Sequence, residues 1–347
     1  MTGGAGFVGS FVVDQLVVRG HSVRVLDSLS KDAHNGEPDY LNRDVEYLWG
    51  DVTDPRAAAK AVTGVDAVCH QAARVGLGVD FGDVTSYVRD NDTGTAVLLQ
   101  ALYRRGFQVR LVLASSMVVY GEGLYECPEH GELRPPPRRT DDLDRGLFEP
   151  RCPRCRAELS PLSVEESCTL DPRNVYAATK VHQEHLCENF ARETGSVSVA
   201  LRYHNVYGPR MPRDTPYAGV ASIFRSALAA GLAPQVFEDG RQRRDFVHVS
   251  DVATANVLAL EADDEVNGAF NVASGEVRTV REMAEALRGA FGERAAAPVV
   301  NGRYRSGDVR HLTATPRRAE TLLGFKALNT FSCGMLEFAT APLRSAI

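Results

Sequence analysis

The chain has 347 residues, with 44% hydrophobic residues, 24% charged residues and a formal net charge of -6, a composition that excludes disordered, fibrous and small disulfide-rich proteins. The acidic balance leaves no overall positive field for a phosphate backbone, so nucleic acid is not expected as a partner. No apolar run approaches the roughly 18 residues of a membrane helix and no signal peptide is seen at the start, so we predict a cytoplasmic protein without a membrane partner.

The first residues combine a glycine-rich loop with the start of a helix pattern and a following strand. The strand predicted over residues 22–26 is followed by Asp27. Glycines at this spacing allow a tight turn, close approach of the backbone to a pyrophosphate and close helix packing. A carboxylate at the end of the second strand accepts hydrogen bonds from the adenosine ribose and repels a 2'-phosphate, which favours NAD over NADP. The residues predicted to hold NAD in this region are Gly3, Gly6, Phe7, Val8, Gly9 and Asp27.

A central strand normally precedes such a loop, but only Met1 and Thr2 precede Gly3 in this sequence. Loss of that strand would leave backbone groups of its neighbours unpaired and would open a gap in the core. We therefore expect the first strand to be missing from the chain as given, and the native start to lie upstream of Met1.

Strand and helix patterns then alternate as far as residue 114. Strands are predicted over residues 45–50, 65–70 and 109–114, and helices over residues 55–62 and 87–105. Such alternation is typical of a parallel sheet covered by helices. The predicted fold class is therefore α/β, with a Rossmann doubly wound parallel sheet that lacks its first strand.

Residues 122–166 interrupt this pattern with proline, arginine, aspartate and cysteine, and are predicted to form an inserted loop. Regular structure resumes near Asn174. We expect an NAD-binding domain over residues 1–200 that carries this insert, and a smaller α/β domain over residues 201–347 that mainly binds substrate. Residues 245–260 are expected to return to the NAD-binding domain.

The insert contains two short motifs of the form C-P-x-H and C-P-x-C. Three thiolates and one imidazole fit a closed tetrahedral zinc site, which would stabilise a proline-rich segment with little core of its own. Because four protein ligands fill the coordination sphere, such a zinc would be structural rather than catalytic. The alternative is that these are ordinary thiols near a flexible loop. The predicted metal ligands are Cys127, His130, Cys152 and Cys155.

Tyr176 and Lys180 are spaced so that they share one face of a predicted helix. An ammonium beside a phenol favours the phenolate and is expected to lower the pKa of Tyr176 toward neutrality, as general-base catalysis requires. Ser116, at the end of a predicted strand, supplies a hydroxyl to orient a substrate oxygen. The alternative is an incidental pair on a surface helix. The predicted catalytic residues are Ser116, Tyr176 and Lys180, and Lys180 is also expected to contact NAD.

The chain resembles the extended short-chain dehydrogenases/reductases, the family of NAD-dependent nucleotide-sugar epimerases, dehydratases and decarboxylases. The resemblance rests on the order of its motifs: the glycine loop, the acidic strand end, and then the serine, tyrosine and lysine. The resemblance spans nearly the whole chain and implies a homodimer formed through the helices predicted over residues 87–105 and 176–193. It implies further cofactor contacts at Asp51, Val52, Ala72 and Asn91. It also implies that the diphosphate and ribose of a nucleotide sugar are held by Asn205, Arg244, Arg305 and Asp308.

Two positions after Ser116 distinguish the reactions within this family. Where 4,6-dehydratases have an Asp-Glu pair, this chain has Met117 and Val118. Nucleotide-sugar decarboxylases have a glutamate at the Val118 position. The resemblance therefore implies redox chemistry at C4 of the sugar alone.

Residues 114–121, 217–221 and 237–246 are similar to dTDP-L-rhamnose 4-epimerases and neighbouring deoxysugar 4-epimerases. His204 replaces the more usual aromatic residue, which affects the shape of the sugar pocket. The leading hypothesis is a 4-epimerase that oxidises a dTDP- or UDP-hexose to a 4-keto intermediate and reduces it on the opposite face. The alternatives are a decarboxylase or 4-keto-reductase of the same family, and a non-catalytic NAD-binding interaction protein.

Overall fold

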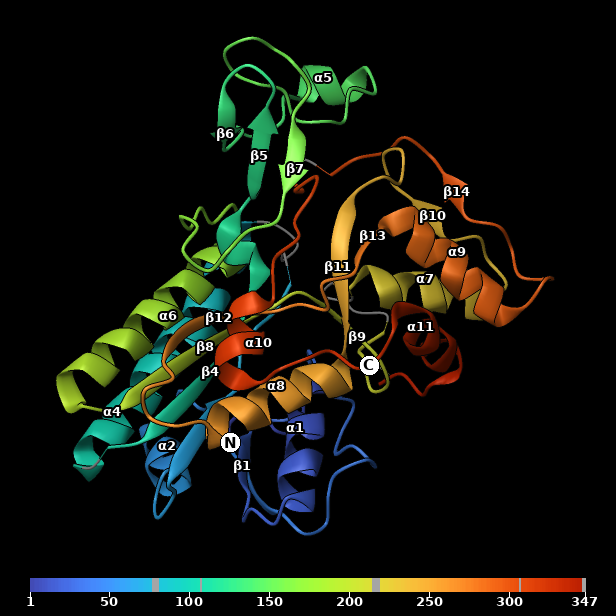
Figure 1. The fold of residues 1–347 in the computed structure, drawn as a ribbon. Helices are drawn as coiled ribbons and strands as arrows, with labels where there is room; N and C mark the ends of the chain where they lie inside the picture. The colour runs from blue at the N-terminus through green and yellow to red at the C-terminus, as the bar shows by residue number, and fades with distance from the viewer. Residues whose placement is uncertain (77–80, 107, 214–218, 306, 345–347) are drawn as a thin grey trace.

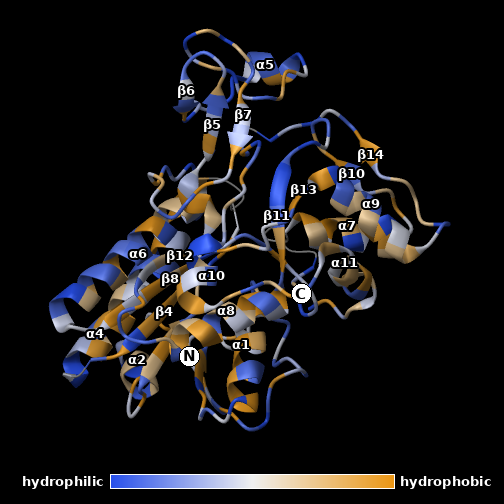
Figure 2. Cartoon of the chain, in the orientation of Figure 1, coloured by the Kyte–Doolittle hydropathy of each residue, from blue (hydrophilic) through white to orange (hydrophobic). Residues whose placement is uncertain are grey.

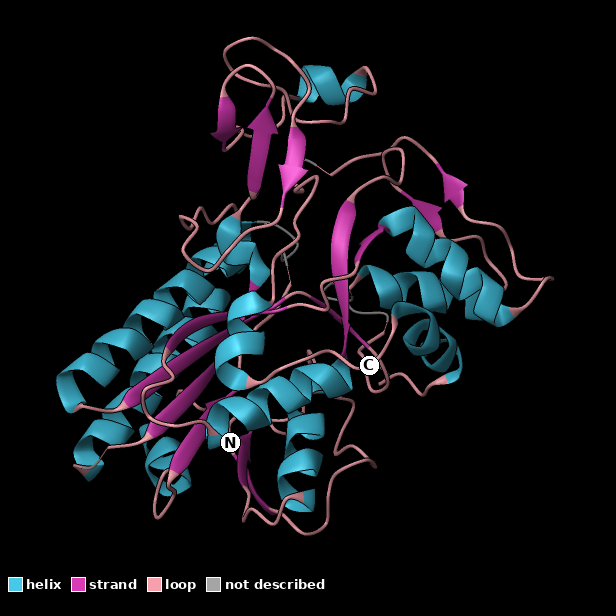
Figure 3. Cartoon of the chain, viewed as in Figure 1, coloured by secondary structure: helices cyan, strands magenta, loops and turns pink. Residues whose placement is uncertain are grey.

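The computed structural model describes residues 1–76, 81–106, 108–213, 219–305 and 307–344 (Figure 1). Tyr217 and Ala218, from one of the segments that carry the resemblance, lie outside the described residues. A sheet with helices packed against it forms one body, a smaller group of strands and helices forms a second, and the inserted segment projects away from both (Figures 1 and 3).

The helices and strands have the following bounds. The α-helices are α1 (Phe7–Val18), α2 (Pro55–Ala61), α3 (Val84–Tyr87), α4 (Gly94–Arg105), α5 (Thr140–Asp144), α6 (Val175–Thr194), α7 (Val220–Ala229), α8 (Val249–Glu261), α9 (Val280–Phe291), α10 (Arg317–Leu323) and α11 (Phe331–Thr340). The strands are β1 (Arg24–Asp27), β2 (Glu46–Trp49), β3 (Ala67–His70), β4 (Arg110–Ser116), β5 (Leu124–Cys127), β6 (Gly131–Leu133), β7 (Ser160–Leu162), β8 (Val197–Tyr203), β9 (Asn205–Tyr207), β10 (Gln235–Val236), β11 (Arg243–His248), β12 (Gly268–Val272), β13 (Val277–Thr279) and β14 (Val299–Val300). Short helical turns cover Phe81–Asp83 and Met117–Tyr120, and a π-helix over Val88–Thr93 joins α3 to α4.

The larger sheet is parallel and carries the core of the first body. Its strands follow the order β12, β8, β4 and β3, and the pair β1 and β2 continues it on the far side of Thr2. β4 is buried from Arg110 to Ser115, and Figure 2 shows hydrophobic residues along the strands of this sheet. Nearly continuous apolar runs are what a strand needs when both faces of its sheet are covered. The structure confirms the predicted α/β fold with a parallel Rossmann-type sheet.

Thr2 occupies a central position between β1 and β3. It makes parallel bridges with Leu26 and His70. Its amide donates to the Cys69 carbonyl at 3.0 Å, and its own carbonyl accepts from the Gln71 amide at 3.1 Å. The glycine loop therefore leaves the sheet where the carboxyl ends of β1 and β3 meet, which is the edge at which parallel sheets bind ligands.

α6 is the helix that carries Tyr176 and Lys180, and its inner face packs against β4. It begins where the Asn174 side chain accepts a hydrogen bond from the Ala177 amide at 2.8 Å. It ends at Gly195, whose φ of +70° closes the helix in the left-handed conformation. Among the helices that the structure describes, including this long one, none combines the length and the apolar character needed to cross a membrane.

The second body is more interleaved with the first than the sequence indicates. Its strands β9, β11 and β13 form one sheet, β10 pairs with β14, and α7, α9 and α11 pack beside them. The expected boundary at residue 200 falls inside β8, and both β8 and β12 pair in the larger sheet. Of the expected returning segment 245–260, α8 packs against α1, whereas residues 245–248 belong to β11 of the smaller sheet. These strands are short apolar runs whose partners are distant in sequence, so periodicity alone does not assign them to a sheet.

The insert has more regular structure than the loop that its sequence predicts. Its strands form a three-stranded antiparallel sheet in the order β6, β5 and β7, and α5 follows β6 in the chain. Each of these strands has three or four residues. An alternating pattern over so few residues does not stand out from a loop, which explains the incorrect expectation.

Burial of His70 generates a prediction about acid stability. Its Nδ1 lies 2.6 Å from Thr2 Oγ1 and its Nε2 lies 2.9 Å from Thr95 Oγ1, and burial lowers its pKa to about 3. Below pH 6.5 the imidazole of His70 binds a proton in the unfolded chain but not in the folded chain. The free energy of unfolding therefore falls as the pH drops from about 6.5 toward 3. At pH 5 this residue should cost about 2 kcal/mol of the free energy of unfolding relative to pH 7.

Urea unfolding at pH 7 and pH 5 measures this cost, with His70→Gln as the variant that does not titrate. Between pH 7 and pH 5, the free energy of unfolding of the variant should fall by about 2 kcal/mol less than that of the natural chain. An equal loss in both proteins would contradict the assignment.

Candidate active site

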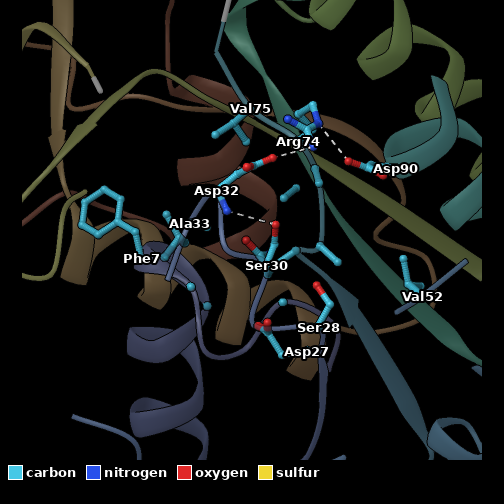
Figure 4. A pocket seen from close by; sticks show the side chains of 18 of the residues that line it. Phe7, Asp27, Ser28, Ser30, Asp32, Ala33, Val52, Arg74, Val75 and Asp90 are labelled. Carbon is cyan, nitrogen blue, oxygen red and sulfur yellow. Dashed lines mark hydrogen bonds and ion pairs between the residues drawn. The ribbon is translucent and has the colours of Figure 1, made fainter. Parts of the chain in front are cut away.

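A cavity of about 370 Å³ opens at the carboxyl edge of the larger sheet. Figure 4 shows part of its lining, from Phe7 and Asp27 on one side to Arg74 and Asp90 on the other. The predicted cofactor and catalytic residues that line it are Gly3, Gly6, Phe7, Val8, Gly9, Asp27, Asp51, Val52, Ala72, Tyr176 and Lys180.

The glycine loop approaches the end of β3 so closely that side chains are excluded. A Cβ on Gly3 would lie 2.6 Å from the Ala72 nitrogen, and a Cβ on Gly9 would lie 2.1 Å from the Gly3 oxygen. Gly6 precedes α1 and supplies no side-chain cap, so the first-turn amides are available to an anion in the cavity. The loop therefore has the geometry of a cradle for a pyrophosphate.

Asp27 stands at the end of β1 with its carboxylate held in place. Its Oδ2 accepts a hydrogen bond from the Ala5 amide at 3.0 Å, and its Oδ1 accepts one from the Leu29 amide at 2.9 Å. Because Asp27 also lines the cavity, its remaining lone pairs can accept hydrogen bonds from a ribose bound there.

Arg74 is a cavity residue that the sequence reasoning missed. Its Nε donates to Asp90 at 2.8 Å and its Nη2 donates to Asp32 at 2.9 Å (Figure 4). These ion pairs join the loop after β1 to the π-helix before α4. Its position just after the end of a parallel strand could have indicated that Arg74 lies at the cavity. His34 and Arg344 also line the cavity, but they come from segments without a motif.

Ser116, Tyr176 and Lys180 meet where the end of β4 lies beside α6. Lys180 Nζ lies 5.8 Å from the centre of the Tyr176 ring and donates to the Ala114 carbonyl at 2.8 Å. The Ser116 hydroxyl hydrogen-bonds to the Tyr176 hydroxyl. One helix face and one strand end thus bring three functional groups together at the edge of the cavity.

The pKa values of this group differ from the expected pattern. Burial raises the pKa of Tyr176 to about 12, and the hydrogen bond with Ser116 opposes this shift only in part. Burial also lowers the pKa of Lys180 to about 8. The expectation that Lys180 brings the phenol toward neutrality is not met in the chain by itself, because the ammonium donates to the Ala114 carbonyl and the phenol is desolvated.

Asn91 is not among the residues that line the cavity, and its expected contact with the cofactor stays a prediction. Its Oδ1 accepts from the Arg74 amide at 2.7 Å, and its Nδ2 donates to the Arg74 carbonyl at 3.0 Å and to Thr179 Oγ1 at 2.9 Å. Asn91 is fully buried. Because its hydrogen-bonding groups are already engaged, its role here is to position Arg74 and α6.

Two of the predicted substrate residues lie together near the base of the insert. Asp308 lines a small cavity of about 150 Å³, and burial raises the pKa of its carboxyl while nearby Arg244 opposes the shift. Arg244 donates to the carbonyls of Val309 and Arg310 at 2.8 and 2.9 Å. The segment that carries Asp308 is therefore held by Arg244.

Asn205 and Arg305 are the other two predicted substrate residues. Asn205 Nδ2 donates to the Asp245 carbonyl at 3.2 Å and lies 3.4 Å from Met117 Sδ. A thioether thus stands beside Asn205 at the position where dehydratases of the resembled family have an acid. The Arg305 guanidinium lies 5.5 Å from the centre of the Phe237 ring. Neither Asn205 nor Arg305 lines the larger cavity.

The predicted metal ligands come together within the insert. Cys127 Sγ lies 3.5 Å from His130 Nδ1 and 3.6 Å from Cys155 Sγ, and Cys152 Sγ lies 3.6 Å from the same His130 nitrogen. All four donor atoms lie within 4.8 Å of one another. This group belongs to the insert, and none of its members lines the larger cavity.

Comparison with known families decides what kind of protein carries this site. The sequence profile described as "NAD dependent epimerase/dehydratase family" matches residues 1–141 and 156–273. The chain belongs to this family. The epimerase/dehydratase match omits residues 142–155, which lie in the insert and include Cys152 and Cys155.

Members of the family with related sequences have several activities. A dTDP-L-rhamnose 4-epimerase from Burkholderia thailandensis is 30% identical, with 98% of this chain and 93% of the relative covered. A UDP-N-acetyl-alpha-D-glucosaminuronate decarboxylase from Bacillus cytotoxicus is 31% identical, with 82% of this chain and 77% of the relative covered. The solved structure of UDP-glucose 4-epimerase with UDP-glucose from Thermotoga maritima has a TM-score of 0.78 at 29% identity and covers 97% of this chain and 96% of that one.

The cavity of this epimerase/dehydratase chain fits the NAD that the family uses. The start of α1, which has no side-chain cap, faces the cavity, and Asp27 closes one end of it. The backbone contacts of Gly3 and Gly9 leave no room for side chains on the glycine loop. Lys180 and Tyr176 line the same cavity, so a cofactor bound there would lie next to both side chains.

A single methyl group added to the glycine loop tests this assignment. Gly9→Ala should weaken NAD binding by about tenfold or more, because its Cβ would lie 2.1 Å from the Gly3 oxygen and must push the loop apart. Calorimetric titration of the NAD-free protein with NAD measures the change. Gly289→Ala is the matched control, since nothing lies near a Cβ at that helical position; equal NAD affinity in both variants would count against the cradle.

Proposed function

We propose that the chain is an NAD-dependent nucleotide-sugar 4-epimerase. The observation that carries the proposal is that Tyr176 and Lys180 line the cavity that fits NAD, with Ser116 beside Tyr176. Next to them Met117 and Val118 provide no carboxylate. The site therefore has the groups for removing a hydroxyl proton and lacks, at those two positions, an acid for elimination of water.

Tyr176 acts as the base on the C4 hydroxyl. Its phenolate takes the hydroxyl proton as C4 is oxidised, and returns that proton when the 4-keto sugar is reduced on its other face. Bound NAD supplies the two-electron acceptor for the first half of this cycle and, once reduced, the donor for the second half. Because the two halves cancel, the sugar leaves with C4 inverted and with no net change in oxidation state.

Ser116 and Lys180 support the tyrosine in different ways. The Ser116 hydroxyl, already hydrogen-bonded to Tyr176, orients the substrate oxygen. Lys180 contributes a positive charge near the phenol ring and a contact to the cofactor ribose. The raised pKa of Tyr176 means that the phenolate forms only when positive charge is added nearby, and the oxidised nicotinamide is such a charge.

The nucleotide end of the substrate must stay fixed while the sugar turns. We assign this task to Asn205, Arg244, Arg305 and Asp308, with a guanidinium on the diphosphate as the principal contact. The proposed substrate class is a dTDP- or UDP-hexose, with dTDP-L-rhamnose as the first candidate because a relative of that activity covers nearly the whole chain. The proposal includes a homodimer through α4 and α6, where Tyr103 is 66% exposed.

A nucleotide-sugar decarboxylase is the second candidate. A relative of that activity matches at 31% identity over 82% of the chain. The position at which decarboxylases have a glutamate is Val118, which is not charged and lies in the turn after Ser116. This difference ranks the epimerase first.

NMR of dTDP-L-rhamnose and a panel of UDP- and dTDP-hexoses incubated with the enzyme tests the proposed reaction. We expect the C4 epimer to form with no net change in NADH. Release of carbon dioxide from a uronic-acid substrate would move the assignment to a decarboxylase. A keto product with NADH accumulating would indicate an oxidoreductase.

Tyr176→Phe should lower turnover by about 10²- to 10⁴-fold, because the base is lost while the ring remains. The amount of NAD retained by the purified variant should equal that of the natural chain. Tyr47→Phe is the control, since its ring stacks on Trp49 at 5.1 Å outside the cavity. Unchanged epimerisation in Tyr176→Phe would refute the role of this tyrosine.

A further inference from the structure

The insert carries a group of three cysteines and one histidine that the proposed reaction does not use. Two turns supply these side chains. The first, over residues 127–130, joins β5 to β6, and the second, over residues 152–155, lies between α5 and β7. Since the turns are far apart in sequence, only the fold of the insert brings their donor atoms within 4.8 Å of one another.

The second turn is shaped around a sulfur atom. The Cys152 amide donates to the Ala157 carbonyl at 2.8 Å, which closes the turn as a small hairpin. The backbone amides of Arg154 and Cys155 both donate to Cys152 Sγ. Two amides directed at one sulfur favour a thiolate ligand over a packed thiol.

The distances between donor atoms match the edges of a tetrahedron around a zinc ion. With Zn–S near 2.3 Å and Zn–N near 2.0 Å, a regular site has edges of about 3.5 to 3.8 Å. The measured separations are 3.6 Å for Cys127 Sγ to Cys155 Sγ, and 3.5 and 3.6 Å from the His130 nitrogen to Cys127 and Cys152. These three separations fit one ion, and all four donor atoms lie within 4.8 Å of one another.

The insert has only a small apolar core of its own. Its buried core consists of Tyr125, Cys127, Cys152 and Leu159, with a few half-buried neighbours. Figure 2 shows that many residues of the insert are hydrophilic. A small segment with such a core ordinarily needs a metal or disulfides to hold one structure.

We propose that Cys127, His130, Cys152 and Cys155 bind one structural Zn²⁺. The three thiols lose their protons on binding and the neutral imidazole contributes the lone pair of Nδ1, so the filled site carries one negative charge. Four protein ligands leave no position for substrate or water, which makes the site structural. A disulfide between Cys127 and Cys155 would require their sulfur atoms to close from 3.6 Å to about 2.05 Å and would leave Cys152 and His130 unpaired.

The ion also stabilises the wall of the smaller cavity, by way of Glu149. This glutamate lies just before the second turn and accepts hydrogen bonds from Arg310 Nε at 3.0 Å and from His311 Nε2 at 2.7 Å. Arg310 is fully buried. Glu149 therefore joins the metal-binding part of the insert to the segment that contains Asp308.

Three further contacts connect the same two segments. The Arg310 amide donates to Glu122 at 2.7 Å, and the Arg138 guanidinium donates to the Asp308 carbonyl at 2.7 Å. The His311 amide donates to the Tyr125 hydroxyl at 3.2 Å. We infer that metal binding keeps Asp308 in place for the substrate. This role of Asp308 rests on the proposed function. The zinc site itself does not depend on that function.

Metal content tests the site directly. The full chain, purified without a chelator and dialysed, should contain about one zinc per protein chain by mass spectrometry of the elements. Replacement of zinc by Co²⁺ should produce the visible absorption of a tetrahedral cobalt–thiolate site. Cys152→Ser with Cys155→Ser should reduce zinc to near zero, whereas Cys333→Ser, an exposed cysteine on α11, should retain it.

Zinc near zero in the natural chain, together with an absent cobalt spectrum, would overturn the proposal. So would an intact mass showing that two thiols had been oxidised to a disulfide, or full zinc in the double variant. The first two results need no variant, so misfolding of the double variant does not prevent a decision.

Hydrogen exchange tests the link to the smaller cavity without any assay of activity. Removal of zinc should speed exchange in a peptide covering residues 308–313 by about tenfold or more, because its amides are bonded to the insert. A peptide covering the glycine loop should exchange as before. If the enzyme epimerises a nucleotide sugar, zinc removal should also raise KM on the order of tenfold with kcat within about twofold. Unchanged exchange at residues 308–313 would overturn the link while leaving the zinc site and the proposed function standing.

Discussion

The cofactor cavity depends on the contact of backbone with backbone between the glycine loop and the end of β3. Gly3 stands so near Ala72 that no side chain fits between them, and Gly9 stands even nearer to Gly3. This contact fixes the start of α1 over the carboxyl edge of the sheet. The cavity, the orientation of Asp27 and the approach of the cofactor to Tyr176 all depend on it, because each is built outward from that edge.

The acid-base centre shows how burial sets chemistry that spacing alone does not. A tyrosine and a lysine on one helix face suggest a phenol activated by an ammonium. In the folded chain, however, Lys180 is directed to the Ala114 carbonyl and both groups are desolvated, so the pKa of Tyr176 rises and that of Lys180 falls. A base with a raised pKa remains protonated until positive charge arrives beside it.

Charged side chains connect the insert to the rest of the chain, in addition to the apolar clusters that the insert and the two bodies share. Arg310 is enclosed by Glu149, Glu238 and Asp239. A buried guanidinium needs acidic partners, because without them its charge would be uncompensated. The consequence is that the insert, part of which the family match omits, is tied to the segment containing Asp308.

The sequence by itself determined the features that depend on local pattern or on residue chemistry: the α/β fold from its alternation, the cofactor loop from its glycines and Asp27, and the candidate metal group from two short motifs. The tertiary structure decided what depends on distant neighbours. It assigned β8 and β12 to the larger sheet and brought in Arg74. The physical reason is that helix periodicity and turn chemistry act over a few residues, whereas strand pairing, burial and the direction of a buried charge are set by parts of the chain that meet only after folding.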